Sequence, residues 1–408
     1  MEHSPYRLTL LVCLAEILGL APIAVFPALL PTFQVEWGLN NTAAGWISAA
    51  FYAGYMVLVP VMSSVTDRLD ARKIMGFGAL LGILSALGYA VGARGFWSAL
   101  ALRFLAGVGL AGIYMPGLKV VSDYTEGALQ SRFVSFYTAS FSIGASLSYL
   151  LAGEVNSLAG WRWAFAGSAF GTVVALVIIV VFVPAGKLRK GEKEALLADF
   201  QVVFRSRAAM AYILGYAAHM WELFSMRSWI VAFLAFSIQL QPAGAATWSP
   251  TRIAFIINLI GLPASIAGNE LSRIFDRQKV ITAIMVGSAV LASMLGFSAS
   301  FPYVVVTAMA ILHGITVVGD SASLTAGVVA VAPAGLRGTT LAVHSTFGFG
   351  AAFLGPLAVG MILDFFGGGQ TGWAMAFVTM AAGCLLGPIF LTRLKPKPGT
   401  AADTAQEQ

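Results

Sequence analysis

The chain alternates between long apolar runs and short polar segments. A membrane core of about 30 Å needs about 20 apolar residues per helix, so runs of that length predict membrane-spanning helices. There are twelve, at Leu8–Leu30, Ala44–Met62, Ile74–Val91, Phe96–Val121, Phe133–Val155, Trp163–Val183, Ala208–Phe236, Ile253–Leu271, Val280–Ser298, Pro302–Gly327, Thr340–Phe365 and Trp373–Leu391. Polar segment 184–207 separates six runs from six. We predict an all-α integral membrane protein with twelve transmembrane helices in two pseudo-symmetric six-helix bundles, 1–183 and 208–394.

Composition supports a membrane protein. Hydrophobic residues make up 58% of the chain and charged residues 10%, whereas soluble proteins carry about 25% charged residues. A soluble enzyme, a disordered scaffold and a disulfide-rich secreted domain are therefore excluded. Cys13 and Cys384 lie inside apolar runs and are interpreted as packing residues. The net charge of +6 does not indicate nucleic acid, because the basic residues lie mostly in short loops.

The distribution of cations predicts the orientation. One set of connections carries only Arg94, Arg162 and Arg252. The other set carries Arg7, Arg68, Arg72, Lys73, Arg132, Lys187, Arg189, Lys190, Lys193, Arg205, Arg207, Arg273, Arg277, Lys279, Arg337, Arg393, Lys395 and Lys397. Positive loops face the cytoplasm, so we expect a bacterial inner-membrane protein with both termini cytoplasmic. Segment 184–207 is then a cytoplasmic linker, and 395–408 a disordered cytoplasmic tail. The first run is too long for a cleaved signal.

Polar positions repeat between the two halves at an offset of 205 or 206 residues. The pairs are Arg68 and Arg273, Arg72 and Arg277, Arg132 and Arg337, and Glu16 and Glu222. Duplicated halves related by an axis along the membrane normal, with a site between them, are a known transporter plan.

Three motifs carry a resemblance to the major facilitator superfamily over nearly the whole chain. They are the loop Asp67-Arg68-x-x-x-Arg72-Lys73 with its weaker copy at Arg273 and Arg277, the sequence Arg103-Phe-Leu-Ala-Gly107-Val-Gly109, and Gly160-Trp161-Arg162-Trp163. The resemblance implies a secondary transporter working by alternating access. Similarity to bacterial anion porters is looser, and the substrate subfamily is unresolved. Two departures are Asp70, where the family usually has Gly, and the absence of the exporters' Gly–Pro pattern in span five, which favours uptake.

The cytoplasmic loops are interpreted as a conformational lock. Asp67 can sit against a neighbouring helix terminus and pair with Arg132, which would hold an outward-facing state and break on rocking. The full predicted lock comprises Asp67, Arg68, Arg72, Arg132, Arg273 and Arg277.

Ionisable residues inside spans are costly and indicate function or a fixed partner. The candidates for proton coupling are Glu222, Asp320, Glu16, His313, His219 and His344. Imidazole titrates near neutral pH, and desolvation favours protonated carboxyls. The alternative for Glu222 is a permanent partner, either His313 or an arginine. The alternative for Asp320 is a hydrogen bond to Ser321, Ser323 or His344, and Glu16 has an equally structural alternative.

The candidates for substrate binding are Arg227, Arg103, Trp221 and Tyr114. Guanidinium offers a planar donor fork to carboxylate-like groups. Arg103 has the alternative of fixing neighbouring helices. Resident carboxylates could balance both arginines, with Glu16 for Arg103, or an entering anion could do so.

The sequence therefore predicts a monomeric, proton-coupled transporter of a small organic or inorganic anion. The alternative is a proton-antiport exporter of drugs or metabolites. No phosphate-binding glycine loop or nucleophile–base arrangement is present, so we expect neither ATP-driven pumping nor an enzyme, and no cofactor. A copper site at His219, Met220 and Met226 is a weak possibility, and we expect no metal. The partners are a small solute, protons and the bilayer.

Overall fold

The computed structural model describes residues 4–66, 68–185, 197–244 and 247–394, and the regular elements within these ranges are all α-helices. They are α1 (Pro5–Gly19), α2 (Val25–Ala28), α3 (Leu30–Glu36), α4 (Asn41–Val65), α5 (Ala71–Gly92), α6 (Phe96–Asp123), α7 (Gly127–Ala159), α8 (Trp161–Phe182), α9 (Leu197–Arg205), α10 (Arg207–Gln239), α11 (Pro250–Ile274), α12 (Arg277–Phe297), α13 (Tyr303–Gly319), α14 (Ser321–Ala330), α15 (Arg337–Phe365) and α16 (Gln370–Arg393).

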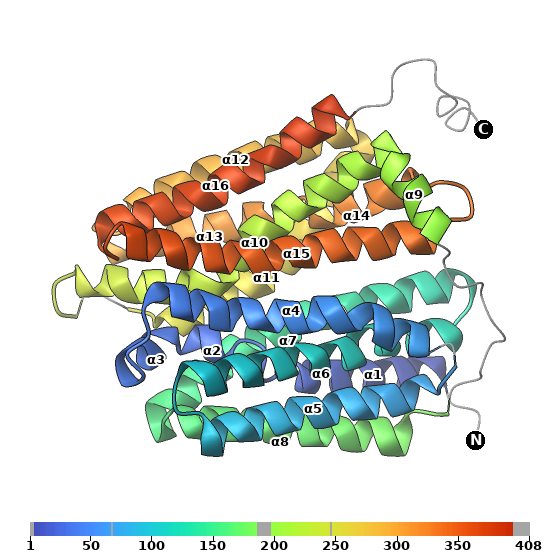
Figure 1. Cartoon of the computed structure of the whole chain (residues 1–408), viewed down its shortest axis with the longest axis horizontal. Coiled ribbons are helices and arrows are strands. Elements are labelled where there is room, and N and C mark those ends of the chain that lie inside the picture. The colour runs from blue at the N-terminus through green and yellow to red at the C-terminus, as the bar shows by residue number, and fades with distance from the viewer. Residues whose placement is uncertain (1–3, 67, 186–196, 245–246, 395–408) are drawn as a thin grey trace.

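The helices form two groups that lie side by side (Figure 1). We name α1–α8 the N-terminal half and α9–α16 the C-terminal half. They meet mainly where α4 packs against α15 and α7 against α11. The first turn of α1 and the last turn of α16 lie at one end of the molecule, which we name the terminal end (Figure 1). The opposite end, where α3 ends and α4 begins, is named the far end.

Eleven segments of the described chain are long and apolar enough to cross a membrane. They correspond to predicted spans two to twelve, and the all-α membrane fold is confirmed. One short helix, α9, falls inside the polar segment predicted as a linker.

The first predicted span, Leu8–Leu30, differs from the prediction because it is not one continuous helix. The chain leaves α1 after Gly19 and continues through two short helices, α2 and α3. Pro27 lies in α2, and Pro31 lies in the first turn of α3. Proline lacks an N–H and is tolerated best in a first helical turn, so both residues favour interruption of a long helix.

Side chains from two other helices satisfy the backbone that this interruption exposes. The Ser148 hydroxyl of α7 accepts from Ala24 N at 3.0 Å and donates to Ala21 O at 2.6 Å. Arg103 Nη1 of α6 donates to Ile23 O at 3.0 Å. Non-helical backbone at membrane depth is tolerated only where protein groups or a watered cavity satisfy it, so these contacts make the break stable.

The tenth predicted span is also interrupted, at Asp320 between α13 and α14. The backbone of α11 lies directly against this break, because a Cβ on Gly268 would overlap the carbonyl oxygen of Gly319. Only glycine permits an approach this close.

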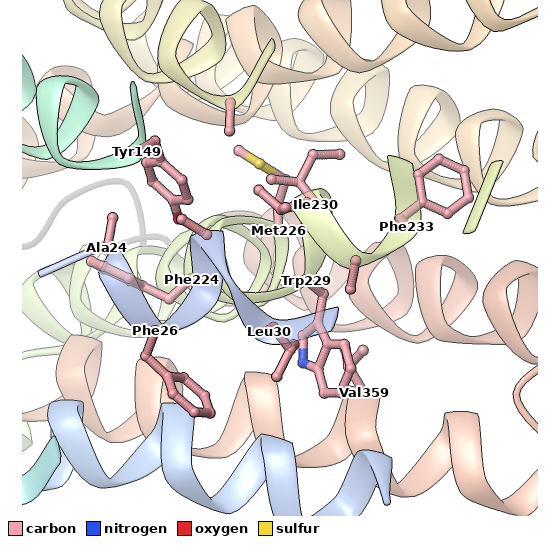
Figure 2. Close-up of a cluster of buried hydrophobic side chains, with 14 of the residues drawn as sticks. Ala24, Phe26, Leu30, Tyr149, Phe224, Met226, Trp229, Ile230, Phe233 and Val359 are labelled. Atoms are coloured by element: carbon pink, nitrogen blue, oxygen red, sulfur yellow. The ribbon is translucent and has the colours of Figure 1, made fainter. Parts of the chain in front are cut away.

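Buried apolar residues form three clusters whose positions differ at the two ends. At the far end, one cluster draws on both halves. Figure 2 shows Leu30 of α3 with Trp229 and Phe224 of α10 and Val359 of α15. At the terminal end there are instead two clusters, one built from α1 and α5–α8 and the other from α9, α10, α12 and α14–α16. The halves therefore share a core only toward the far end.

Candidate functional site

Four buried charged residues lie on the helices of predicted spans one, four, seven and ten. Glu16 lies in α1, Arg103 in α6 and Glu222 in α10, while Asp320 lies between α13 and α14. Each is at most 3% exposed, so none faces lipid. A buried ion is costly unless it is paired and hydrogen-bonded. The partners of each residue therefore decide what it can do.

Glu222 forms a pair with an imidazole inside the C-terminal half. His313 Nε2 of α13 lies 3.1 Å from Glu222 Oε1, and the Ser288 hydroxyl of α12 donates to the same oxygen at 2.9 Å. A carboxylate and an imidazole at this distance share one proton when their net charge is zero. Unit charges about 4 Å apart interact by about 4 kcal/mol at an effective dielectric constant of 20. The charge on either group therefore strongly affects the other.

Asp320 forms a second pair. His219 Nδ1 of α10 lies 2.7 Å from Asp320 Oδ1, close enough for an ion pair. The two groups are not aligned for a hydrogen bond, since Asp320 Oδ1 has no hydrogen-bond partner among the described residues. The two pairs join the same helices in opposite senses, because α10 supplies His219 to one and Glu222 to the other. Asp320 stands at the break between α13 and α14. Changes in its charge therefore act on a point where the helix is already interrupted.

A stack of rings extends from the second pair. Tyr216 lies between two imidazoles, with ring centroids 5.6 Å from His219 and 3.8 Å from His344. His219 Nε2, His344 Nδ1 and Asp320 Oδ1 are buried and have no hydrogen-bond partner among the described residues. An unsatisfied buried polar atom costs about 1–3 kcal/mol, and ordered water usually meets such a need.

Glu16 has a simpler environment than its counterpart Glu222. The Ser140 hydroxyl of α7 donates to Glu16 Oε2. Its other oxygen, Oε1, is buried and has no partner among the described residues. The described chain shows no histidine, lysine or arginine at ion-pair distance from it.

Arg103 contacts backbone and aromatic rings. Besides its bond to Ile23 O, its Cζ atom lies 4.6 Å from the ring centroid of Phe51 and 5.7 Å from that of Phe26. Glu16 does not supply its counter-charge, so that suggestion from the sequence is wrong for the described state. The alternative, in which Arg103 fixes neighbouring helices, has direct support from the bond to the interrupted first span.

Arg227 of α10 is partly buried and has no carboxylate at ion-pair distance among the residues described. Its Cζ atom lies 5.4 Å from the Phe224 ring centroid, and its Nε is buried without a hydrogen-bond partner. The Tyr52 ring lies 5.3 Å from that of Phe51, which Arg103 contacts, and 4.6 Å from that of Phe224, which Arg227 contacts. The two guanidinium groups therefore approach the same region from opposite halves.

The two aromatic candidates pack within their own halves. Trp221 Nε1 donates to Thr379 O of α16 at 3.2 Å. Tyr114 stacks on Tyr137 at 5.8 Å between centroids and meets Phe141 edge-on at 5.3 Å, both on α7. Neither contact brings the ring to the guanidinium groups.

The predicted lock is described only in part. Asp67 lies outside the described residues, so its pairing with Arg132 stays a prediction. The Arg132 guanidinium lies 5.5 Å from the Phe136 ring centroid. Arg72 lies 3.6 Å from Asp70, the residue that caps α5, and Arg273 lies 3.2 Å from Glu270, one turn earlier in α11. The five arginines flank helix ends at the terminal end, at Arg68, Arg72, Arg132, Arg273 and Arg277.

At the far end, a carboxylate of one half caps a helix of the other. Asp364 Oδ1, in the last turn of α15, accepts from Asn41 N at 3.0 Å and from Asn41 Nδ2 at 2.9 Å. Its Oδ2 accepts from Thr42 N at 2.7 Å. These amides open α4, so the carboxylate satisfies N–H groups that the helix itself cannot and meets the positive end of the helix dipole.

Two further polar contacts join the halves nearby. Arg252 of α11 forms a two-bond pair with Glu154 of α7, at 2.7 and 3.0 Å. The Tyr149 hydroxyl of α7 donates to the backbone oxygen of Arg227 at 2.5 Å. The far end is thus closed by polar bonds as well as by the shared core.

Sequence reasoning missed these contacts. It gave no role to Glu154 and Asp364, which lie near the ends of the predicted spans Phe133–Val155 and Thr340–Phe365. The available signal was two acids at the cation-poor end, but helical spacing does not reveal which helices meet there. It also missed Ser140 and Ser288, because hydroxyl residues are common in membrane helices and carry no spacing signature.

No group of three histidine, cysteine or acidic residues that could hold a metal occurs in the part of the chain that the structure describes. His219, the central residue of the copper alternative, lies against Asp320 instead.

The fold and the buried charges define a helical membrane protein of two halves, with ionisable residues buried inside each half. A model of the Major Facilitator Superfamily matches residues 12–268, and the chain belongs to this superfamily of membrane transporters. Members of this superfamily are transporters rather than enzymes.

Curated relatives and solved structures agree with this family. The chain is 26% identical over 245 residues to "Protein spinster homolog 1" of Homo sapiens, covering 57% of this chain and 46% of that protein. It is 25% identical over 156 residues to "Probable sphingolipid transporter spinster homolog 1" of Arabidopsis thaliana, covering 38% and 32%. The chain thus spans less than half the length of these relatives. A bacterial spinster homologue solved inward-facing and unoccupied has the same fold, with a TM-score of 0.75, 15% identity, and coverage of 97% and 96% of the two chains.

Proposed function

We propose that the chain is a proton-coupled secondary active transporter of a small organic or inorganic anion. The observation that carries this proposal is the arrangement in the C-terminal half. Two buried histidine–carboxylate pairs join α10 to α13 and to Asp320, which follows α13. Helix α10 also carries Arg227, whose guanidinium has no described carboxylate beside it.

The pairs supply proton binding in this proposal. Each pair is neutral with one proton. A second proton makes the pair positive, and placing that charge in a poorly hydrated core costs free energy. The cost falls if an anion enters at the same time, because opposite charges stabilise each other at low dielectric. Loading the proton and the anion together is therefore easier than loading either alone, which is the thermodynamic basis of symport.

Arg227 supplies the anion contact. Its buried, unpartnered Nε leaves the guanidinium fork incompletely bonded, and a carboxylate or similar oxyanion fits that fork with two parallel bonds. The bond from Tyr149 to the carbonyl of Arg227 also belongs to the far-end closure. An anion that binds Arg227 and shifts it would therefore also alter the contact between the halves. Arg103 is proposed to add positive potential from the opposite half.

Alternating access between two halves, residues 1–183 and 208–394, accounts for the contrast between the ends. The described state has a shared core and polar closure at the far end but separate cores at the terminal end. We place both termini in the cytoplasm of a bacterial cell, with 184–207 and 395–408 on that side, because the cation-rich loops lie at the terminal end. The described state is then closed on the side away from the cytoplasm. We also propose that the transporter acts as a monomer.

Two alternatives have specific support. Proton antiport of drugs or metabolites would use the same histidine–carboxylate pairs with opposite coupling. A sphingolipid-like amphiphile is suggested by the name of the Arabidopsis thaliana relative, and the aromatic rings around both arginines would suit its apolar part. We favour the small anion because the unpaired guanidinium fork calls for an anionic group, whereas the apolar contacts are general to membrane helices.

The test begins with purified protein and a thermal-shift panel of lactate, acetate, nitrate, phosphate, a drug-like cation and sphingosine. An anion that raises the melting temperature is then offered to proteoliposomes with and without an imposed pH gradient. Accumulation that requires the gradient supports the proposal. Stabilisation only by the cation or by sphingosine contradicts the anion assignment, and gradient-independent accumulation contradicts the proton coupling.

A further inference from the structure

A groove runs between α5 and α8 on the outer face of the N-terminal half. The two helices lie side by side at the edge of the molecule, away from the C-terminal half (Figure 1). The groove encloses about 400 Å³. Gly76 of α5 forms part of its floor, because a Cβ there would meet only Leu176 of α8, at 3.7 Å. The walls include Leu80 and Val180, which are 45% and 56% exposed.

The end of the groove nearest the terminal end is basic. Arg72 and Lys73, in the first turn of α5, line it there. Arg72 is held in place, with Nη1 3.5 Å from Val183 O and Nε 3.6 Å from Asp70 Oδ2. Lys73 is exposed and has no carboxylate at ion-pair distance among the described residues. Among the described residues that line or pair with this end, one acid therefore faces two cations, which leaves it a positive charge.

The dimensions of the groove match one leaflet of a bilayer. From Arg72 to Leu80 the helix rises by about 12 Å at 1.5 Å per residue. The hydrocarbon of one leaflet is about 15 Å deep, half of the core thickness of about 30 Å. An acyl chain lying along Gly76 and Leu80 would thus bring its headgroup to the level of the two cations.

We infer that this groove binds one anionic phospholipid of the leaflet at the terminal end, with its phosphate at Arg72 and Lys73 and one acyl chain over Gly76. Basic residues at the membrane surface attract anionic lipids, and the apolar walls provide the second, independent contact. This site is separate from the buried charges of the proposed transport function, so either assignment can fail without the other.

The experiment uses the full chain, purified in detergent, with native mass spectrometry of bound lipid. The probes are dioleoyl phosphatidylglycerol, dioleoyl phosphatidylcholine and soluble glycerol 3-phosphate, which has a phosphate headgroup but no chains. The variants are Lys73→Gln, which removes the exposed cation, and Gly76→Leu, which fills the floor. The control is Lys279→Gln, an exposed cation in the first turn of α12, the equivalent helix of the other half.

We expect wild-type protein and Lys279→Gln to retain phosphatidylglycerol in preference to phosphatidylcholine. Lys73→Gln should reduce phosphatidylglycerol binding several-fold, down to the level of phosphatidylcholine. Gly76→Leu should reduce the binding of both lipids. Equal retention of the two lipids by wild type, unchanged binding in both variants, or glycerol 3-phosphate binding as tightly as the lipid would each overturn the assignment.

Discussion

The two halves place equivalent acids in very different surroundings. In the N-terminal half, the Glu16 carboxylate is bonded to a serine hydroxyl, and Arg103 is bonded to a backbone carbonyl. In the C-terminal half, Glu222 is bonded to an imidazole, and a second histidine–carboxylate pair lies on the same helices. A serine hydroxyl does not titrate in the physiological range, whereas imidazole does. In the proposed function, the N-terminal half therefore braces the fold and the C-terminal half binds the protons.

The two interrupted spans show the same difference between the halves. The break in the first span is held by Ser148 and Arg103, neither of which changes charge near neutral pH. The break in the tenth span has Asp320 at its centre, beside His219. In the proposed function, proton binding at Asp320 or His219 acts directly on the second break, whereas Ser148 and Arg103 hold the first break without a change of charge.

The largest effect should come from removing the titrating carboxylates. Glu222→Gln and Asp320→Asn each keep the side-chain volume but leave the paired histidine without an acid. We expect accumulation driven by a pH gradient to fall to near background in both, while exchange of labelled for unlabelled anion continues. Full gradient-driven accumulation by both variants in proteoliposomes would show that neither residue carries the proton.

The next effect separates the two arginines. A hydrogen bond to a charged group contributes about 1.5–3 kcal/mol, so Arg227→Gln should weaken anion binding about 10- to 100-fold. Arg227→Lys should weaken anion binding less than Arg227→Gln, because lysine keeps the positive charge although it lacks the planar donor fork. Arg103→Gln should chiefly lower the melting temperature, because it frees the Ile23 carbonyl.

Isothermal titration calorimetry measures the anion affinity of each variant, and thermal unfolding measures its melting temperature. An Arg227→Gln variant with unchanged affinity, or a substrate that proves to be a cation, removes the anion assignment.

A smaller effect concerns the contact between the halves. Asp364→Asn keeps one acceptor oxygen but loses the second and the charge at the start of α4. A change of about 1–2 kcal/mol alters an equilibrium about 5- to 30-fold, so the far end should open more often. Spin labels at the exposed Val35 and Trp248, in a background without Cys13 and Cys384, report this as a longer distance population.

Glu36→Gln is the matched control for this change, because Glu36 accepts from Trp161 within the N-terminal half and should leave the distance distribution unchanged. A distribution for Asp364→Asn identical to wild type would mean that the cap does not hold the far end closed.

The smallest effect is expected at Glu16. Glu16→Gln keeps an oxygen that can accept from Ser140, so only about 1 kcal/mol is at stake. Gradient-driven accumulation should persist with a modest change in rate. If this variant loses coupling as completely as Glu222→Gln, the contrast between the halves is wrong.

Much of the fold follows from the sequence, because hydropathy reports membrane depth directly. Spans two to twelve were predictable from their apolar runs, and the Arg68–Arg273 offset revealed the duplication. The first span was misjudged as continuous because hydropathy does not register hydrogen bonds. Its break depends on Ser148 and Arg103, which lie more than 75 positions away in the chain.

The site was predictable as a set of residues but not as a set of contacts. The cost of burying charge identified Glu222, Asp320 and the histidines. It did not reveal that His219 meets Asp320 while His313 meets Glu222, because pairing depends on how α10 and α13 are rotated. Asp364 was overlooked for a related reason, since two of its three hydrogen-bond donors are backbone amides, which no sequence pattern distinguishes.

The most direct test of proton coupling in the C-terminal half is proton movement itself. Proteoliposomes containing a trapped pH-sensitive dye would receive whichever anion of the thermal-shift panel binds. Wild type and Glu16→Gln should move protons with the anion, and the Glu222→Gln, Asp320→Asn double variant should exchange anion without moving protons. Equal proton movement by the double variant, or none by wild type during transport, would contradict the account.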